Sequence, residues 1–70
     1  MAGFKHELLL KLRESKAWSR REMMLKLHDA GVDTTEETLA SWEKGETVPD
    51  ADKLGPISRV LGVQIDTLVR

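Results

Sequence analysis

The sequence predicts an all-α domain of five short helices, organised around a helix-turn-helix between about residues 19 and 45. The capping-box pattern, in which Ser or Thr precedes Glu by three residues, opens a helix. It occurs twice, at Ser19–Glu22 and at Thr34–Glu37. Gly31 and Gly45 follow the two helical stretches and favour the left-handed conformation that ends a helix. Apolar residues at helical spacing accompany these signals along the chain.

Length and composition restrict the class of protein. The 70 residues make a single domain, residues 1–70, and a chain of this size buries only about 60% of its unfolded surface. It has no cysteine, which excludes disulfides and thiolate metal sites. Its longest apolar run, residues 8–10, is too short for a membrane span or a signal peptide. We therefore expect a cytoplasmic protein with no membrane partner.

The charged residues are unevenly distributed along the chain. The net charge of −1 does not favour a polyanionic partner. Residues 1–31, however, carry seven Lys/Arg against four Asp/Glu, a net +3, whereas residues 32–70 carry four against eight, a net −4. The basic first half could face phosphates. Ordinary solvated surface accounts for the same charges, and both interpretations stay open.

The first two helices are predicted over about residues 4–16 and 20–30. Each has an apolar stripe that is expected to face the core. The residues of these stripes are Phe4, Leu8, Leu9, Leu12, Met23, Met24 and Leu27. Leu10 lies off its stripe and is expected to be partly exposed. His28, in the last turn of the second helix, favours the negative end of the helix dipole.

The remaining helices are predicted over about residues 35–44, 51–61 and 63–69. The inward residues of the third and fourth helices are Leu39, Trp42, Leu54, Ile57, Val60 and Leu61. Asp50 can cap the fourth helix. Pro56 costs about 3 kcal/mol in a helix interior. The sequence therefore predicts either a kink there or a helix that begins at Pro56 after a separate turn.

Several motifs follow one another along nearly the whole chain. The first helix and the start of the second contain Leu9-x-x-Leu12-Arg13-Glu14 and Lys16-Ala17-Trp18-Ser19. The third helix ends in Leu39-x-x-Trp42-Glu43-Lys44-Gly45. The last part contains Pro49, Leu54, Ile57, Leu61-Gly62-Val63, Asp66 and Leu68. In this order the motifs resemble the lambda-repressor/Cro-type helix-turn-helix family, also called the xenobiotic-response-element type.

The resemblance implies a compact five-helix, lambda-repressor-like DNA-binding domain. Its implied function is sequence-specific binding of double-stranded DNA by a small transcriptional repressor or regulator of bacterial or phage type. Members often act as homodimers on palindromic DNA, so a homodimer is a candidate assembly. A cytoplasmic protein of this kind is associated with the nucleoid when it is bound to DNA.

The chain departs from the family pattern in its residues at several positions and in the length of one connection. Arg20 stands where the family usually has Gln, and Met24 where it usually has Ala. The connection from Met24 to Leu39 is longer than usual by about five residues. Acidic residues, Glu36, Glu37 and Glu46, occupy positions that are usually polar or basic.

The resemblance places the DNA contacts at the start of the second helix and along the third. The candidate residues are Arg20, Arg21, Thr35, Glu36, Glu37, Thr38, Ser41 and Lys44. Arg binds phosphate or guanine, and Glu accepts a hydrogen bond from cytosine N4. Each charged candidate also has a structural alternative: solvated surface for the arginines, capping or dipole contacts for Glu36 and Glu37, and a favourable helix-end charge for Lys44. Trp18 and Trp42 are predicted to pack in the core or at its rim.

The acidic start of the third helix motivates a second hypothesis. In it, the chain is a protein-interaction module that kept the fold and lost DNA binding, with a protein partner instead. An enzyme is not predicted, because nothing in the sequence assembles an acid, a base and a nucleophile. No cofactor is expected. The spacing of His28, Asp29 and Asp33 matches no metal-ligand pattern.

Overall fold

A computed structural model describes residues 3–69, most of which lie in five α-helices. The helices are α1 (His6–Ser15), α2 (Arg20–Asp29), α3 (Glu36–Lys44), α4 (Ala51–Leu61) and α5 (Ile65–Val69). The predicted all-α class with five helices is confirmed, and every predicted helix boundary lies within two residues of the observed one. None of these helices has the length and apolar character that crossing a membrane requires.

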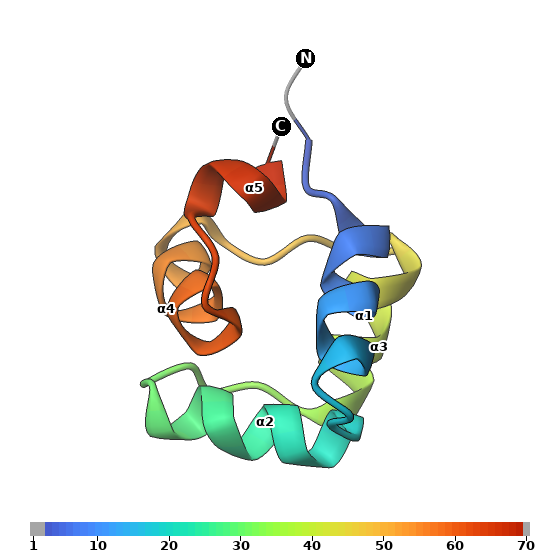
Figure 1. The fold of residues 1–70 in the computed structure, drawn as a ribbon, viewed down its shortest axis with the longest axis vertical. Coiled ribbons are helices and arrows are strands. Elements are labelled where there is room, and N and C mark those ends of the chain that lie inside the picture. Colours follow the sequence, from blue (N-terminus) through green and yellow to red (C-terminus); the bar gives the residue numbers. More distant parts are fainter. Residues whose placement is uncertain (1–2, 70) are drawn as a thin grey trace.

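The five helices form a closed ring in space, in an order that differs from their order in the chain. Going round the ring, α1 packs on α3, α3 on α2, α2 on α4, α4 on α5, and α5 returns to α1. Figure 1 shows α2 closing one end of the ring and α5 the other, with α4 across from α1 and α3. The backbone N–H of Lys5 donates to the Leu68 carbonyl at 2.6 Å, which joins the segment before α1 to α5.

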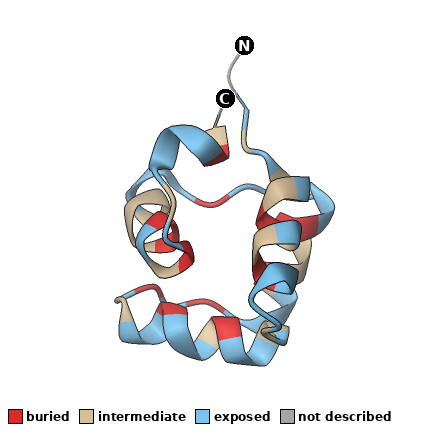
Figure 2. Ribbon diagram, in the orientation of Figure 1, coloured by how far each residue is buried: buried red, intermediate tan, exposed pale blue. Residues whose placement is uncertain are grey.

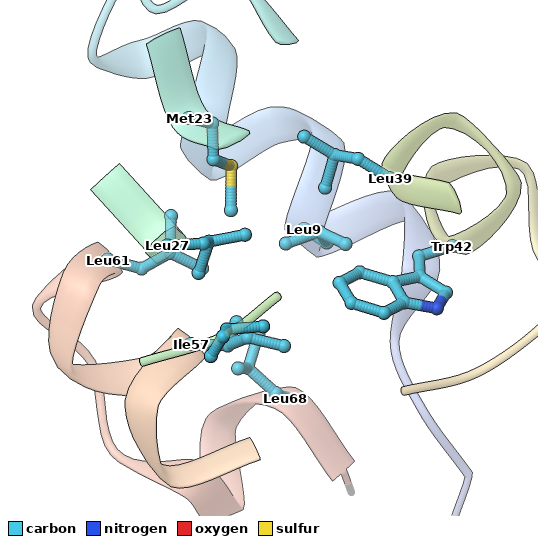
Figure 3. Packing of buried hydrophobic residues seen from close by; sticks show 9 residues of the cluster. Leu9, Met23, Leu27, Leu39, Trp42, Ile57, Leu61 and Leu68 are labelled. Atoms are coloured by element: carbon cyan, nitrogen blue, oxygen red, sulfur yellow. The ribbon is translucent and has the colours of Figure 1, made fainter. Parts of the chain in front are cut away.

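The core fills the centre of this ring. It contains apolar side chains from all five helices and one from the turn before α3. They are Leu9, Met23, Leu27, Val32, Leu39, Trp42, Ile57, Leu61 and Leu68. Figure 2 shows the buried positions facing inward, and Figure 3 shows Leu9 between Met23, Leu39 and Trp42. Full burial stabilises each such side chain by about 1.5–3 kcal/mol. Met24, expected to face the core, is only half-buried.

The start of α2 is capped as predicted. The Glu22 backbone N–H donates to Ser19 Oγ at 3.1 Å, and the Ser19 N–H donates to the Glu22 carboxylate at 3.1 Å. The reciprocal pair satisfies two backbone donors that the first turn of a helix leaves without partners. The capping box at Ser19–Glu22 is therefore confirmed.

The second predicted capping box, Thr34–Glu37, is wrong. The N-cap of α3 is Thr35, whose Oγ1 accepts from the Thr38 backbone N–H at 3.1 Å. Thr34 is buried in the turn, two residues after the core residue Val32. Because the packing of the turn takes Thr34 inside, the helix begins one residue later than the sequence pattern indicates.

The alternative in which the fourth helix begins at Pro56 is wrong, because α4 runs unbroken from Ala51 to Leu61. A proline at this position removes one backbone donor and leaves most of the helix bonds possible. The helix buries Ile57 and Leu61, which stabilises it by packing. Asp50 is the N-cap residue, but its side chain makes no capping bond and lies 3.7 Å from Lys53 Nζ.

Candidate nucleic-acid interface

The α2–turn–α3 unit has a longer turn than the usual helix-turn-helix. Residues 30–35 connect the two helices, whereas the motif usually has three or four turn residues. Two hydrogen bonds hold the turn against α2. The Val32 backbone N–H donates to the Leu27 carbonyl at 2.8 Å, and His28 Nε2 donates to the Thr34 carbonyl at 2.7 Å. The extra residues are thus packed onto α2, with Val32 in the core.

The start of α2 and the start of α3 meet at one open surface groove. Arg13 and Ala40 lie in its wall, together with the predicted site residues Arg20, Glu36 and Glu37. Ser19, the N-cap of α2, completes the lining. The fold therefore gathers three of the eight predicted residues from two helices around one groove. The charges in the groove are mixed, because Glu36 and Glu37 line it together with Arg13 and Arg20.

A buried carboxylate lies beneath this groove. The side chain of Glu43 is 1% exposed and belongs to the last turns of α3. Arg13 of α1 donates to it twice, from Nε to Oε2 at 2.5 Å and from Nη2 to Oε1 at 3.2 Å. Arg20 of α2 donates from Nε to Oε1 at 3.0 Å. We call Arg13, Arg20 and Glu43 the Glu43 triad; it joins three helices through one carboxylate.

The triad satisfies the requirements for a charge inside a protein. A buried carboxylate is costly unless it is paired and hydrogen-bonded. Glu43 accepts three donor bonds from two guanidinium groups, and Arg13 Nη1 also donates to the Trp18 carbonyl at 2.7 Å. Arg13 and Glu43 belong to the motifs of the first and third helices, but the sequence pattern predicts no role for them. One signal was available, since each stands four residues after a core leucine, Leu9 or Leu39, on the inward face of its helix.

Arg20 differs from Arg13 in its access to solvent. Its side chain is 42% exposed, whereas that of Arg13 is 11% exposed. The Nε atom of Arg20 is therefore hydrogen-bonded to Glu43, while part of the same side chain is exposed to solvent. Arg21, the next residue of α2, is exposed. Both predicted arginines of α2 are therefore accessible to a ligand in solution. They differ in that Arg20 is already hydrogen-bonded to Glu43, whereas Arg21 is exposed.

The predicted residues of α3 separate into two groups. Glu37, Ser41 and Lys44 follow i, i+4, i+7 spacing on the side of the helix opposite the core. We call them the outer stripe. Glu37 and Lys44 are exposed, and Ser41 is half-buried with its Oγ 3.4 Å from Glu46 Oε1. The outer stripe is therefore the side of α3 that faces away from the core.

Thr35 and Thr38 form the second group at the start of α3. Their hydroxyl oxygens are 3.0 Å apart, and Thr35 Oγ1 also accepts the backbone N–H of Thr38. Thr38 is half-buried. The hydroxyl of Thr35 therefore caps the helix, which leaves less of it free for a ligand than the sequence pattern indicates.

Trp18 lies at the rim of the core, as predicted, beside the start of α2. Its ring is half-buried against the apolar cluster. Lys16 and Lys26 place their Nζ atoms 5.4 and 4.7 Å from the ring centre, within reach of a cation–π interaction. The Trp18 ring thus has two lysine ammonium groups close to it.

A family model described as helix-turn-helix matches residues 9–68, a span that runs from α1 into α5 and includes the groove and the outer stripe. No curated protein matches the chain.

Proposed function

Because the chain belongs to the lambda-repressor/Cro-type helix-turn-helix family, which comprises DNA-binding regulatory domains, we propose that it recognises specific double-stranded DNA sequences as a small transcriptional repressor or regulator. The observation that carries the proposal is the position of the outer stripe beside the groove. One helix presents side chains for base edges, and the adjacent helix start presents two arginines. This is the division between base readout and backbone contact that helix-turn-helix proteins use.

We assign the phosphate contacts to Arg20, Arg21 and Lys44. All three are cationic and accessible, and they lie at the start of α2 and the end of α3. Guanidinium groups bind phosphate oxygens bidentately, and an ammonium binds them as a point charge. These contacts account for affinity to DNA of any sequence.

We assign base readout to the outer stripe and the start of α3. The Glu37 carboxylate suits cytosine N4, and the Ser41 hydroxyl can donate or accept. Thr35 and Thr38 contribute methyl groups and the remaining hydroxyl capacity. Glu36 lines the groove together with Glu37 and Arg20. The two carboxylates repel the DNA backbone and so lower affinity for sequences that offer them no donor.

The assembly belongs to the same proposal. We propose that one domain, residues 1–70, binds palindromic DNA as a homodimer. We propose that this regulator is of bacterial or phage type and acts in the cytoplasm, at the nucleoid. Exposed apolar side chains on the α4–α5 side support self-association. Val48 is 62% exposed and Ile65 is 41% exposed, and Val48 lies beside Phe4 and Val69.

The experiment is a binding titration at several salt concentrations. It uses a random-sequence duplex and a duplex enriched from a random pool. We expect affinity to fall steeply with salt on both duplexes, with a slope of about 0.9 per phosphate contacted, and to be higher on the enriched duplex. If the protein binds neither duplex at low salt, the proposal is contradicted.

A protein-interaction module is the second candidate. The observation in its favour is the acidity of the same surface, where Glu36, Glu37 and Glu46 are all exposed. A basic protein surface would meet these residues without the repulsion that DNA meets. The titration separates the two candidates, because only a DNA-binding protein shows a salt-dependent duplex affinity.

A further inference from the structure

We propose that Glu43 is a positioning residue for DNA binding, which holds Arg20 by its Nε so that the two Nη groups are directed at a backbone phosphate. This inference rests on the proposed function. The contact that carries it is the bond from Arg20 Nε to Glu43 Oε1 at 3.0 Å, made by a carboxylate that is 1% exposed and an arginine that is 42% exposed.

The geometry of the guanidinium makes the bond directional. Arg has five N–H donors in one rigid plane, one on Nε and four on the Nη atoms. When Nε is bonded to a fixed acceptor, the plane can no longer rotate freely about the side-chain torsions. One Nη–H lies on the same edge of the plane as Nε–H, so the part of the guanidinium that is directed away from Glu43 is its end edge, which has one N–H from each Nη.

Glu43 is suited to this role because it is itself immobile. Arg13 holds its carboxylate by two hydrogen bonds. His6 Nδ1 donates to its backbone carbonyl at 3.2 Å, so α1 contacts both the backbone and the side chain of this residue. The carboxylate cannot follow Arg20 toward the solvent. Arg20 is therefore held at its inner end and offers only its outer end to a ligand.

The charge of the triad favours an anion at the groove. Two guanidinium groups share one carboxylate, so the Glu43 triad has a net charge of +1 (two positive, one negative). Arg13 is the more buried of the two cations, and Arg20 is the one that reaches the surface. A phosphate at Arg20 would balance this charge. Because the side chain is ordered before binding, less conformational freedom is lost when the phosphate arrives.

A lysine cannot replace Arg20 in this arrangement. Its compact ammonium can bond either Glu43 or the phosphate, and it has no second group held at a fixed angle to the first. The test is therefore the Arg20→Lys variant, measured on the enriched duplex against the parent protein. Arg59→Lys is the matched control, since Arg59 is exposed in the last turn of α4.

We expect Arg20→Lys to weaken binding at least about fivefold, although it keeps the charge, and Arg59→Lys to bind as the parent does. A smaller loss in Arg20→Lys shows that a point charge suffices and overturns the inference. If the parent protein binds neither duplex, the proposed function fails instead. The two failures are thus distinguishable.

A second measurement tests the hold on Arg20 without DNA. In NMR spectra of the free protein, we expect the Nε–H of Arg20 to exchange with water at least about tenfold more slowly than that of Arg21. Equal exchange rates overturn the inference whatever the DNA result. In Glu43→Gln, where circular dichroism shows it folded, the protection of Arg20 should fall while Arg21 is unchanged, because the amide has one acceptor oxygen for two arginines. Should that variant unfold, Arg20→Lys and the parent spectra still decide the question.

Discussion

Glu43 near the end of α3 and Arg13 near the end of α1 form a buried ion pair across 30 positions of sequence. The pair lies within a domain whose core is otherwise apolar side chains from five short helices. The ion pair connects α3, which carries the outer stripe, to its neighbour α1 in the ring. The orientation of α3 therefore depends on a polar contact as well as on the packing of Leu39 and Trp42.

The first prediction concerns the loss of this carboxylate. Glu43→Gln should destabilise the protein by about 3–5 kcal/mol, because it leaves the largely buried Arg13 without its counter-charge. Urea denaturation with the circular dichroism of the helices as signal measures the effect. Glu14→Gln on the exposed side of α1 is the control and should keep the parent midpoint. Equal midpoints for the two variants would show that the ion pair contributes nothing to stability.

The second prediction concerns Trp42, which is 3% exposed in the core. Trp42→Ala should cost about 3–5 kcal/mol, a large part of the stability of a domain of this size. Thermal and urea unfolding measure it, and Trp42→Phe should cost clearly less because the cavity is smaller. A cooperative Trp42→Ala variant with the melting temperature of the parent would place the ring at the surface.

The third prediction compares two glycines with positive φ. Gly31 has φ of 89° and open space around an added Cβ, whereas Gly45 has φ of 80° and an added Cβ would lie 2.9 Å from His6 Cδ2. Gly31→Ala should therefore show only the backbone cost of about 1–2 kcal/mol. Gly45→Ala should show that cost and a further loss, because His6 must move from its bond to the Glu43 carbonyl. Equal melting temperatures for the two variants would mean that His6 can move aside without lowering the stability of the protein.

The fourth prediction concerns the exposed carboxylate of Glu37 on the outer stripe. Glu37→Gln should tighten binding to random duplex DNA by about two- to threefold at low salt, because it removes one repulsion with the phosphates. Asp66→Asn, in the first turn of α5, is the control and should leave this affinity unchanged. Weaker binding of Glu37→Gln to the random duplex would remove Glu37 from the DNA-facing surface. On the enriched duplex, a loss in the same variant would assign Glu37 to base readout.

The helices themselves could be predicted because their signals are local. The cap at Ser19–Glu22 involves residues three positions apart, and the apolar stripes repeat within one or two turns. These patterns located five helices to within two residues and placed Trp42 in the core. The errors arose where packing overrides the local signal. Thr34 fits the cap pattern as well as Thr35 does, and only the burial of the turn decides between them. At Pro56 the local cost is real, and the packing of Ile57 and Leu61 outweighs it; a kink near Pro56 stays a prediction.

The candidate site was predictable only in part. The resemblance indicated which helix starts to consider, and the structure places Arg20, Glu36 and Glu37 around one groove. Their contact with DNA stays a prediction. The structure also shows that Thr35 caps α3 and that Arg20 is hydrogen-bonded to Glu43 of the same chain. The sequence specifies neither contact. From sequence alone, a charged residue is expected to be exposed to solvent. A buried charge needs a partner, and the sequence pattern around the residue does not show that partner.

By itself, the sequence determined the all-α class, the number and limits of the helices, and the apolar faces that meet in the core. Each of these depends on interactions within about four residues, which periodicity and capping patterns record. Only the tertiary structure decided that Arg13, Arg20 and Glu43 share one buried contact. Arg13 and Arg20 lie 30 and 23 positions from Glu43, and the ring of helices brings them within hydrogen-bonding distance. The pairing offsets the cost of burying the Glu43 carboxylate, and no local pattern carries that information.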